Sequence, residues 1–235
     1  MSTPSALDSF LDKWRTRWPE WQVAERFVPE AQRALVVAWF TLLQEFDDIL
    51  NTAGDPMPAD AKLAWWGEEL RSWAGQRSRH PLGRVLEPVR APWTQLAEAL
   101  PALVDARAVP VDAAQALGTL HAYAAAVAAV EAVMFDSPAR GDVATPVLVQ
   151  TLAQRLHESG VAAIPRSLLA DDDSTAPRRW AQQLLAKWPA RVAGPRPRRL
   201  YAALARARQL SWAQDRQYQA TPMRTLWLTW WAARG

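Results

Sequence analysis

The chain has no cysteine and little glycine. Among its 235 residues, nine are glycine and eighteen are proline. The absence of cysteine excludes a disulfide framework, a thiolate zinc site and a thiol nucleophile, and it removes any dependence on an oxidising compartment. Abundant Ala, Leu, Arg and Gln, with few β-branched runs, indicate helices with proline-marked ends rather than strands joined by glycine turns. The expected fold class is therefore all-α.

Long hydrophobic runs are also missing. The longest apolar stretches, near 34–43 and 122–130, fall short of the ~20 residues that cross a bilayer. The N-terminus lacks the basic-then-apolar order of a signal peptide, so we expect a cytoplasmic protein without a membrane-spanning segment. Half of the residues are hydrophobic and 22% are charged, which is typical of a globular chain with a sizeable core. Because no repeat or linker is visible, we expect one domain over 1–235, with 1–18 as a helical arm on its surface.

Prolines and capping residues predict where the helices begin and end. Ser5 is the candidate N-cap of a helix at 6–17, and Pro19 follows its end. Pro29 lies in the first turn of a long helix that runs to Leu50. Further helices are expected near 59–76, 82–89, 93–100, 111–135, 145–158, 177–188, 197–216 and 222–234.

The helix at 29–50 has the most informative pattern. Val36, Phe40 and Leu43 form an apolar stripe, and two further steps of four residues along it reach Asp47 and Asn51. We therefore expect two polar groups to face the mouth of a cavity near the C-terminal end of this helix. The helix dipole disfavours carboxylates at a helix C-terminus, so their presence there indicates a role other than contact with solvent. The alternative interpretation is an ordinary core stripe followed by a solvated acidic pair.

Several common sites are absent. There is no glycine-rich phosphate loop, no His-Glu-x-x-His motif and no Gly-x-Ser-x-Gly turn. His80, His121 and His157 do not have the spacing of metal ligands. Neither a recognition helix after a tight turn nor a glycine-aromatic strand pattern is present, so no nucleic-acid partner is expected.

Several segments, in a specific order, resemble one family. Val28-Pro29 with Arg33 leads through one helix into Asp47-Asp48-Ile49-Leu50-Asn51, and the stretches 65–81, 121–128 and 222–234 follow. The chain is similar to the squalene/phytoene synthase family, in which Leu-Pro-x-x-x-Arg precedes an Asp-Asp-Ile-x-Asp box. The resemblance implies a single-domain helical bundle of the isoprenoid-synthase type around a central apolar cavity. Family proteins join two prenyl diphosphates, which Mg²⁺ holds between two Asp-rich helices.

The resemblance also shows where this chain departs from the family. Carboxylates four residues apart share one helix face and can ligate Mg²⁺, but here Asp47 is kept as the metal ligand and Asn51 replaces the distal acid. An ungapped count from Gly160 places Leu152 and Leu156 where the family has its second Asp pair. A shifted alignment would recruit Glu158 or the acids at 171–173 instead. The residues that the resemblance implies for substrate binding are Arg33, Val36, Phe40, Leu43, Gln44, Asp47, Asp48, Asn51, Tyr123, Leu152 and Leu156.

Three functional hypotheses follow. The first is a family member with an eroded magnesium-diphosphate site and no catalytic residues, which binds an isoprenoid or a partner. Its only candidate cofactor is Mg²⁺, which is needed if the diphosphate site is functional. The second is an active prenyl-diphosphate transferase with a rearranged metal site. The third is a scaffold protein at an anionic membrane, on its inner face, because ten Lys and Arg residues face a single acid between Arg178 and Arg216. In this third hypothesis Trp180, Trp188 and Trp212 lie among those arginines at the membrane interface.

Overall fold

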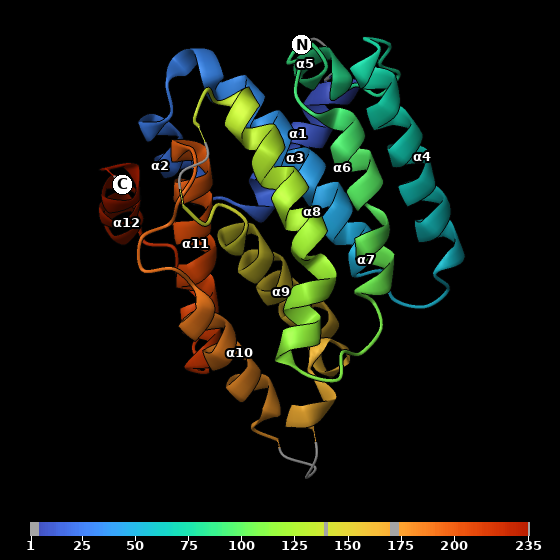
Figure 1. The fold of residues 1–235 in the computed structure, drawn as a ribbon. Coiled ribbons are helices and arrows are strands. Elements are labelled where there is room, and N and C mark those ends of the chain that lie inside the picture. The colour runs from blue at the N-terminus through green and yellow to red at the C-terminus, as the bar shows by residue number, and fades with distance from the viewer. Residues whose placement is uncertain (1–4, 139–140, 170–173, 235) are drawn as a thin grey trace.

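The computed structural model describes residues 5–138, 141–169 and 174–234, and within these ranges the chain is helical and contains no strand (Figure 1). The expected all-α class is therefore confirmed. In chain order the α-helices are α1 (Ala6–Arg17), α2 (Trp21–Ala24), α3 (Glu30–Leu50), α4 (Met57–Ala74), α5 (Gly83–Leu86), α6 (Trp93–Ala99), α7 (Pro101–Asp105), α8 (Ala113–Met134), α9 (Thr145–Ser159), α10 (Ala176–Lys187), α11 (Arg196–Ala213) and α12 (Pro222–Arg234). The described residues also form the short 3₁₀ turns η1 (Glu25–Phe27), η2 (Gly160–Ala163) and η3 (Arg166–Leu168).

The helix ends follow from local chemistry. The Ser5 side chain accepts a hydrogen bond from the amide of Asp8, whose carboxylate accepts one from the Ser5 amide, which completes a capping box. Pro29 lies at the N-cap of α3, one position before the helix. Two features were not expected from the sequence. The short helix α2 follows Pro19, and Pro101 begins α7 directly after α6, since proline is tolerated in a first turn.

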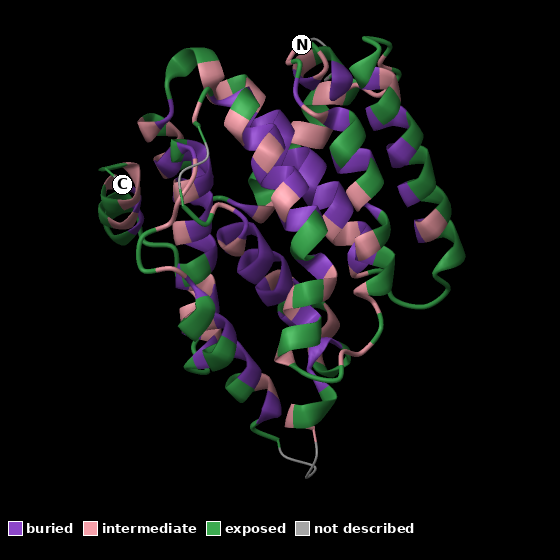
Figure 2. Cartoon of the chain, viewed as in Figure 1, coloured by how far each residue is buried: buried purple, intermediate pink, exposed green. Residues whose placement is uncertain are grey.

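Helix α3 lies at the centre of the bundle. Most of its length is buried, as the purple ribbon in the interior of Figure 2 shows. Helices α1, α4, α5, α7 and α9 pack against it, while α11 packs against α9, α10 and α12. A helix that is apolar on almost every side is stable only inside the protein, and this explains its central place.

The N-terminal helix α1 is part of the core, so the expectation of a surface arm is wrong for one of its faces. Trp14 and Trp18 are buried, at 1% and 2% exposure. The Trp14 ring stacks on Phe40 of α3 with 5.9 Å between ring centroids, and it lies 6.0 Å from Tyr201 of α11. Indoles four residues apart share one helix face, and burying that face places α1 over α3 and α11.

Helix α8 is the one helix of the described residues that is long and apolar enough to cross a membrane by length and composition. Half of its most apolar window is buried inside the protein. It packs against α6, α7 and α9, and these contacts are those of a core helix.

Candidate functional site

The acidic end of α3 contacts the cationic face of α1. Asp48 accepts hydrogen bonds from Lys13 at 3.1 Å, from Gln44 of its own helix at 3.0 Å and from Arg17. Burial alone would raise the pKa of Asp48, but the hydrogen bonds from Arg17, Gln44 and Lys13 hold it below its ordinary value. Asp48 is therefore a charged, fully engaged carboxylate rather than an open ligand.

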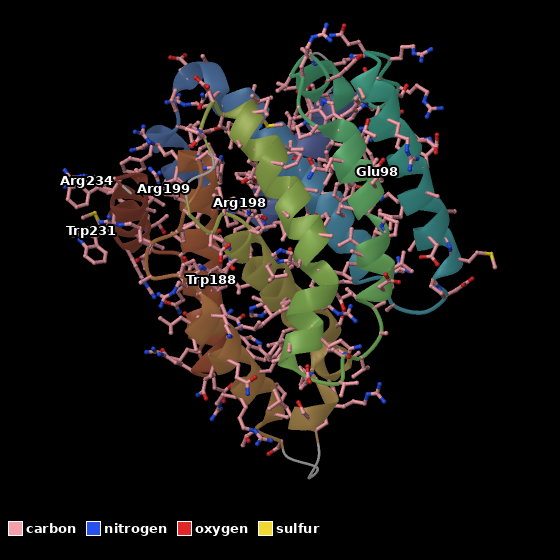
Figure 3. All side chains as sticks on the ribbon, in the orientation of Figure 1. Glu98, Trp188, Arg198, Arg199, Trp231 and Arg234 are labelled. Atoms are coloured by element: carbon pink, nitrogen blue, oxygen red, sulfur yellow. The ribbon has the colours of Figure 1, made fainter. Side chains whose placement is uncertain are left out.

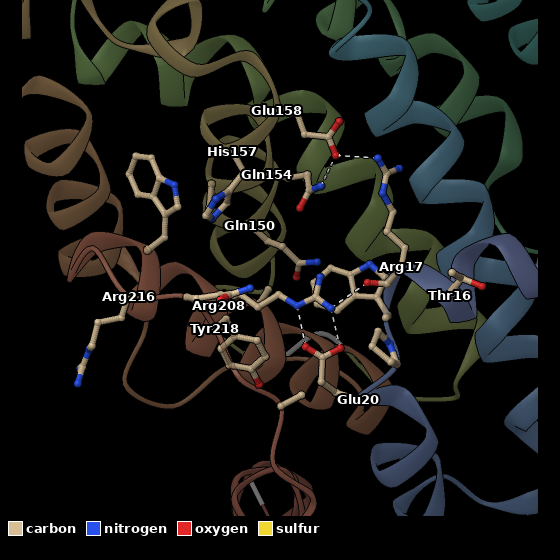
Figure 4. Close-up of a pocket in the computed structure, with 17 residues that line it drawn as sticks. Thr16, Arg17, Glu20, Gln150, Gln154, His157, Glu158, Arg208, Arg216 and Tyr218 are labelled. Carbon is tan, nitrogen blue, oxygen red and sulfur yellow. Dashed lines mark hydrogen bonds and ion pairs between the residues drawn. The ribbon is translucent and has the colours of Figure 1, made fainter.

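Arg17 also reaches an acid on the opposite side of the site. Its Nη2 donates to Glu158 of α9 at 3.0 Å, and the same carboxylate oxygen accepts from Gln154 at 2.6 Å (Figure 4). One guanidinium thus bridges carboxylates from two different helices, α3 and α9. Arg17 is not among the site residues predicted from the sequence, although its i, i+4 spacing from Lys13 places two cations on one face of α1.

Asp47 lies in a different environment from its neighbour. Its carboxylate is partly buried, and within the described residues it takes part in no hydrogen bond or ion pair. Burial, followed by the negative charges of Asp48 and Glu158, raises the pKa of Asp47 to about 8. Its carboxyl group is therefore mostly neutral at pH 7, and a metal ion would have to displace the proton in order to bind there.

The remaining polar position of the predicted box stabilises the end of the helix. Asn51 donates from Nδ2 to the carbonyl of Asp47 at 2.9 Å, and its Oδ1 accepts from the Ser159 hydroxyl at 2.9 Å. Both functional atoms of the amide are used: Nδ2 caps the last turn of α3, and Oδ1 joins that end to the end of α9. Leu152 and Leu156 of α9 are buried, at 4% and 1% exposure, so these two positions add only hydrocarbon.

The apolar stripe of α3 is packed core. Val36, Phe40 and Leu43 are buried, and the Phe40 ring lies 4.3 Å from Tyr201. Tyr123 of α8 is buried edge-on to Phe46. Its burial, and then the charge of Asp47, raise the pKa of the Tyr123 hydroxyl well above its ordinary value.

Arg33 lies apart from the other predicted binding residues. Its Nε donates to the carbonyl of Val28 at 3.3 Å, which stabilises the first turn of α3. It precedes Asp47 by fourteen residues, or about 21 Å along the helix. The structure therefore brings together Gln44, Asp47, Asp48 and Asn51, but not Arg33.

A cavity of about 820 Å³ lies beside this acidic cluster, between α1, α9 and α11 (Figure 4). Trp18 and Trp212 supply apolar walls, and Arg17, Arg208 and Arg216 supply cations. Arg208 donates twice to Glu20, at 2.7 and 2.6 Å, and lies 3.8 Å above the Trp18 ring. The predicted stripe of Val36, Phe40 and Leu43 is not among its lining residues. This volume is in the range of small-molecule binding sites.

Residues 20–136, about half of the chain, match the family model for squalene/phytoene synthase. The chain belongs to the squalene/phytoene synthase family. Searches among the curated proteins and among the solved structures gave no match. The matched segment runs from just before α2 to just after α8, and it includes the acidic end of α3.

The described part of this family member shows no cluster of side chains that could hold Mg²⁺. Within 5–138, 141–169 and 174–234, no group of three or more His, Asp or Glu side chains is arranged to hold a metal ion. Asp47 is held neutral, while Asp48 and Glu158 are both paired with Arg17. The acids at 171–173, the alternative ligands in a shifted alignment, lie outside the described residues. The side chains of the described ranges, as arranged, do not fit a magnesium-bound diphosphate.

A buried polar network near the Phe40 ring was not expected from the sequence. Arg198 of α11 pairs with Glu131 of α8 at 2% and 1% side-chain exposure. It also donates to Gln150 of α9 at 3.2 Å, and the indole N–H of Trp39 donates to Glu131 at 2.8 Å. Arg198 belongs to a basic run in the sequence, and nothing local distinguishes it from its solvent-exposed neighbours.

The tryptophans expected at a membrane interface are not on the surface. Trp180 and Trp188 are buried, at 1% and 4% exposure, and Trp212 is half-buried against His157. That expectation is wrong because Trp180 of α10 and Trp188 directly after it pack into the core, while exposed arginines such as Arg178 and Arg206 lie on the outer faces of α10 and α11. The described residues instead expose Trp227 and Trp231 on α12.

Proposed function

We propose that this squalene/phytoene synthase-like protein does not couple prenyl diphosphates through Mg²⁺ and instead binds an isoprenoid in the cavity between α1, α9 and α11. One observation supports this most directly. The guanidinium of Arg17 lies between the carboxylates of Asp48 and Glu158, so a fixed side-chain cation neutralises the facing acids that a divalent ion would need.

The chemistry of the coupling reaction supports the same conclusion. Ionisation of an allylic diphosphate depends on cations that stabilise the leaving group, and this stabilisation is among the largest contributions in such a site. Several carboxylates must hold those cations. Here one carboxyl group is neutral near pH 7, one box position is an amide used by α9, and the facing positions are leucines. Without the metal cluster, the leaving group has no comparable stabilisation.

The cavity suits an amphiphilic ligand. Pro19, Trp212 and Ala220 offer hydrocarbon surface for an isoprenoid chain. Arg216 lies at the same cavity and forms no ion pair within the described residues, so an anionic headgroup can be bound there without a metal ion.

Incubation with farnesyl or geranylgeranyl diphosphate, Mg²⁺ and NADPH tests the catalytic half of the proposal. We expect neither pyrophosphate release nor a coupled hydrocarbon, and turnover to such a product would contradict the proposal. Calorimetric titration with farnesyl diphosphate, with and without Mg²⁺, tests the binding half. We expect binding that does not require Mg²⁺. An absence of binding under both conditions would reject an isoprenoid as the ligand of the cavity.

One observation favours a second candidate, a transferase with a rearranged metal site. Glu158 of α9 lies close enough to Asp47 to raise its pKa, so acids from two helices do approach each other. This candidate predicts Mg²⁺-dependent diphosphate binding that Asp47→Ala abolishes. An affinity that is unchanged in Asp47→Ala would reject it, and Asp12→Ala on the exposed face of α1 is the matched control.

A further inference from the structure

Helix α12 has the reverse of the usual amphipathic pattern. Its two buried residues are Thr225 and Thr229, at 2% and 0% exposure. Its outward face presents Met223, Trp227 and Trp231, at 76%, 65% and 55% exposure, and these residues are four positions apart. Large apolar side chains aligned on an exposed helix face mark an interaction surface. Figure 3 shows Trp231 and Arg234 pointing away from the body of the protein.

A basic groove lies beside this apolar stripe. It has a volume of about 720 Å³ and is formed by α11, α12 and the segment that follows α10. Four exposed arginines line it, namely Arg191, Arg206, Arg224 and Arg234. Among the described residues, no Asp or Glu lines the groove. None of the four arginines forms an ion pair with another described residue.

Helix α12 is held firmly on the bundle. Arg199 of α11 donates from Nε to the carbonyl of Ala232 at 3.0 Å and from Nη2 to that of Ala233 at 3.0 Å. These bonds satisfy carbonyls in the last turn of α12, which have no partner within the helix. The Trp and Arg side chains therefore project from a fixed scaffold.

We infer that the outer face of α12 and the adjoining groove form a docking surface for a bilayer of anionic phospholipid. Indoles and guanidiniums favour the same shallow layer of a membrane, where the rings contact acyl chains and the cations contact headgroup phosphates. Each arginine near an anionic surface adds to the electrostatic attraction. A second copy of this chain is a poor occupant, because it would bring two uncompensated arginine clusters together.

The helix binds in the plane of the membrane rather than across it. Its 13 residues span about 20 Å as an α-helix, less than the ~30 Å hydrocarbon core. Trp227 and Trp231 enter the interface, and the arginines of the groove lie beside them at headgroup level. This inference does not depend on the proposed function, since the acidic cluster and its neighbouring cavity are formed by other side chains.

Cosedimentation with vesicles tests the inference. We expect the full chain to bind vesicles of phosphatidylcholine with phosphatidylglycerol at low salt, to bind pure phosphatidylcholine weakly, and to dissociate at high salt. The double variant Trp227→Ser, Trp231→Ser should bind about tenfold more weakly, because two interfacial indoles are lost. Trp65→Ser, which removes an exposed indole from α4, is the matched control and should bind normally.

A second variant separates binding from folding. Arg206→Glu with Arg224→Glu reverses two exposed charges and should abolish the preference for anionic vesicles while leaving the thermal unfolding midpoint unchanged. Absence of binding to anionic vesicles at low salt overturns the inference, as does equal binding of both variants and the unaltered chain. Sedimentation velocity adds one further outcome: a dimer that disappears in the double tryptophan variant would assign this face to a second copy and overturn the lipid assignment.

Discussion

Glu131 of α8 and Arg198 of α11 form an ion pair that is almost completely removed from solvent. Because the guanidinium is surrounded by Phe40, Tyr201 and Gln150, removing its partner leaves an uncompensated charge in the core. We expect Glu131→Ala to lower the free energy of unfolding by about 3–5 kcal/mol, measured by urea denaturation. The exposed pair Arg71 and Glu68 is the control, and Glu68→Ala should cost less than about 1 kcal/mol. Equal effects of the two substitutions would show that the buried pair is not structurally important.

Asp47 makes stability depend on pH. Its folded pKa of about 8 lies above the ordinary value of 3.8, so between these values the unfolded chain is ionised while the folded chain keeps the proton. The contribution of this carboxyl group to the free energy of unfolding is therefore complete below pH 4. It is lost as the pH rises toward 8, by at most about 1.4 kcal/mol per pH unit. Asp47→Asn should remove this loss.

Thermal unfolding at several pH values measures the effect. We expect Asp47→Asn to resemble the unaltered chain near pH 4 and to become increasingly more stable by comparison up to pH 8. Asp12→Asn, at a largely exposed position on α1, should show no such trend. A difference that is constant with pH would contradict the protonation of Asp47 in the folded protein.

Arg17 is expected to exclude divalent cations from the acidic cluster. Arg17→Ala leaves Asp48 and Glu158 without their shared guanidinium, and a site for Mg²⁺ then opens between α3 and α9. Mg²⁺ at ten times its dissociation constant should then add roughly 1.4 kcal/mol of stability to the variant. Differential scanning fluorimetry should show this rise in Arg17→Ala but not in the unaltered chain or in Arg15→Ala. A metal response in the unaltered chain would favour the transferase candidate.

Glu69 organises the segment that follows α4. Its buried carboxylate accepts from the amides of Arg79 and His80, at 2.6 and 2.8 Å, and from the Trp73 indole at 2.9 Å. Burial would raise the pKa of Glu69, but these hydrogen bonds, led by those from the His80 and Arg79 amides, hold it below its ordinary value.

We expect Glu69→Ala to cost about 2–4 kcal/mol, because two partly buried amides and a buried indole lose their acceptor. Limited trypsin digestion should then cut faster after Arg77 and Arg79. Glu98→Ala, on an exposed position of α6, is the control. Unchanged digestion in Glu69→Ala would show that the segment is fixed by other contacts.

Much of the fold could be predicted from local patterns. The spacing of apolar residues and the places of proline and Ser5 predict the long helices to within a few residues at each end. The same local patterns place Asp47, Asp48 and Asn51 at one end of α3. They do not show which acid is charged, since the pKa of Asp47 depends on Glu158, which follows it by 111 residues, and on burial by other helices.

The side chains that pair with the site residues could not be predicted from local patterns, for a similar reason. Arg17 and Glu158 are separated by 141 positions, and Glu131 and Arg198 by 67. Nothing at Arg198 distinguishes a buried cation from the exposed arginines around it. The tryptophans show the same limit, since Trp180 and Trp227 both belong to helices with arginines, yet one is buried and the other exposed.

The amino-acid sequence by itself determined that this protein is helical, where its long helices begin and end, and which family it resembles, because these depend on short-range sterics, capping and residue order. Only the tertiary structure decided that Arg17 neutralises the facing acids, that Asp47 holds a proton, and that α12 turns its tryptophans outward. Those properties depend on which distant side chains are brought within a few ångströms, and both electrostatic and hydrophobic free energies are set by that proximity.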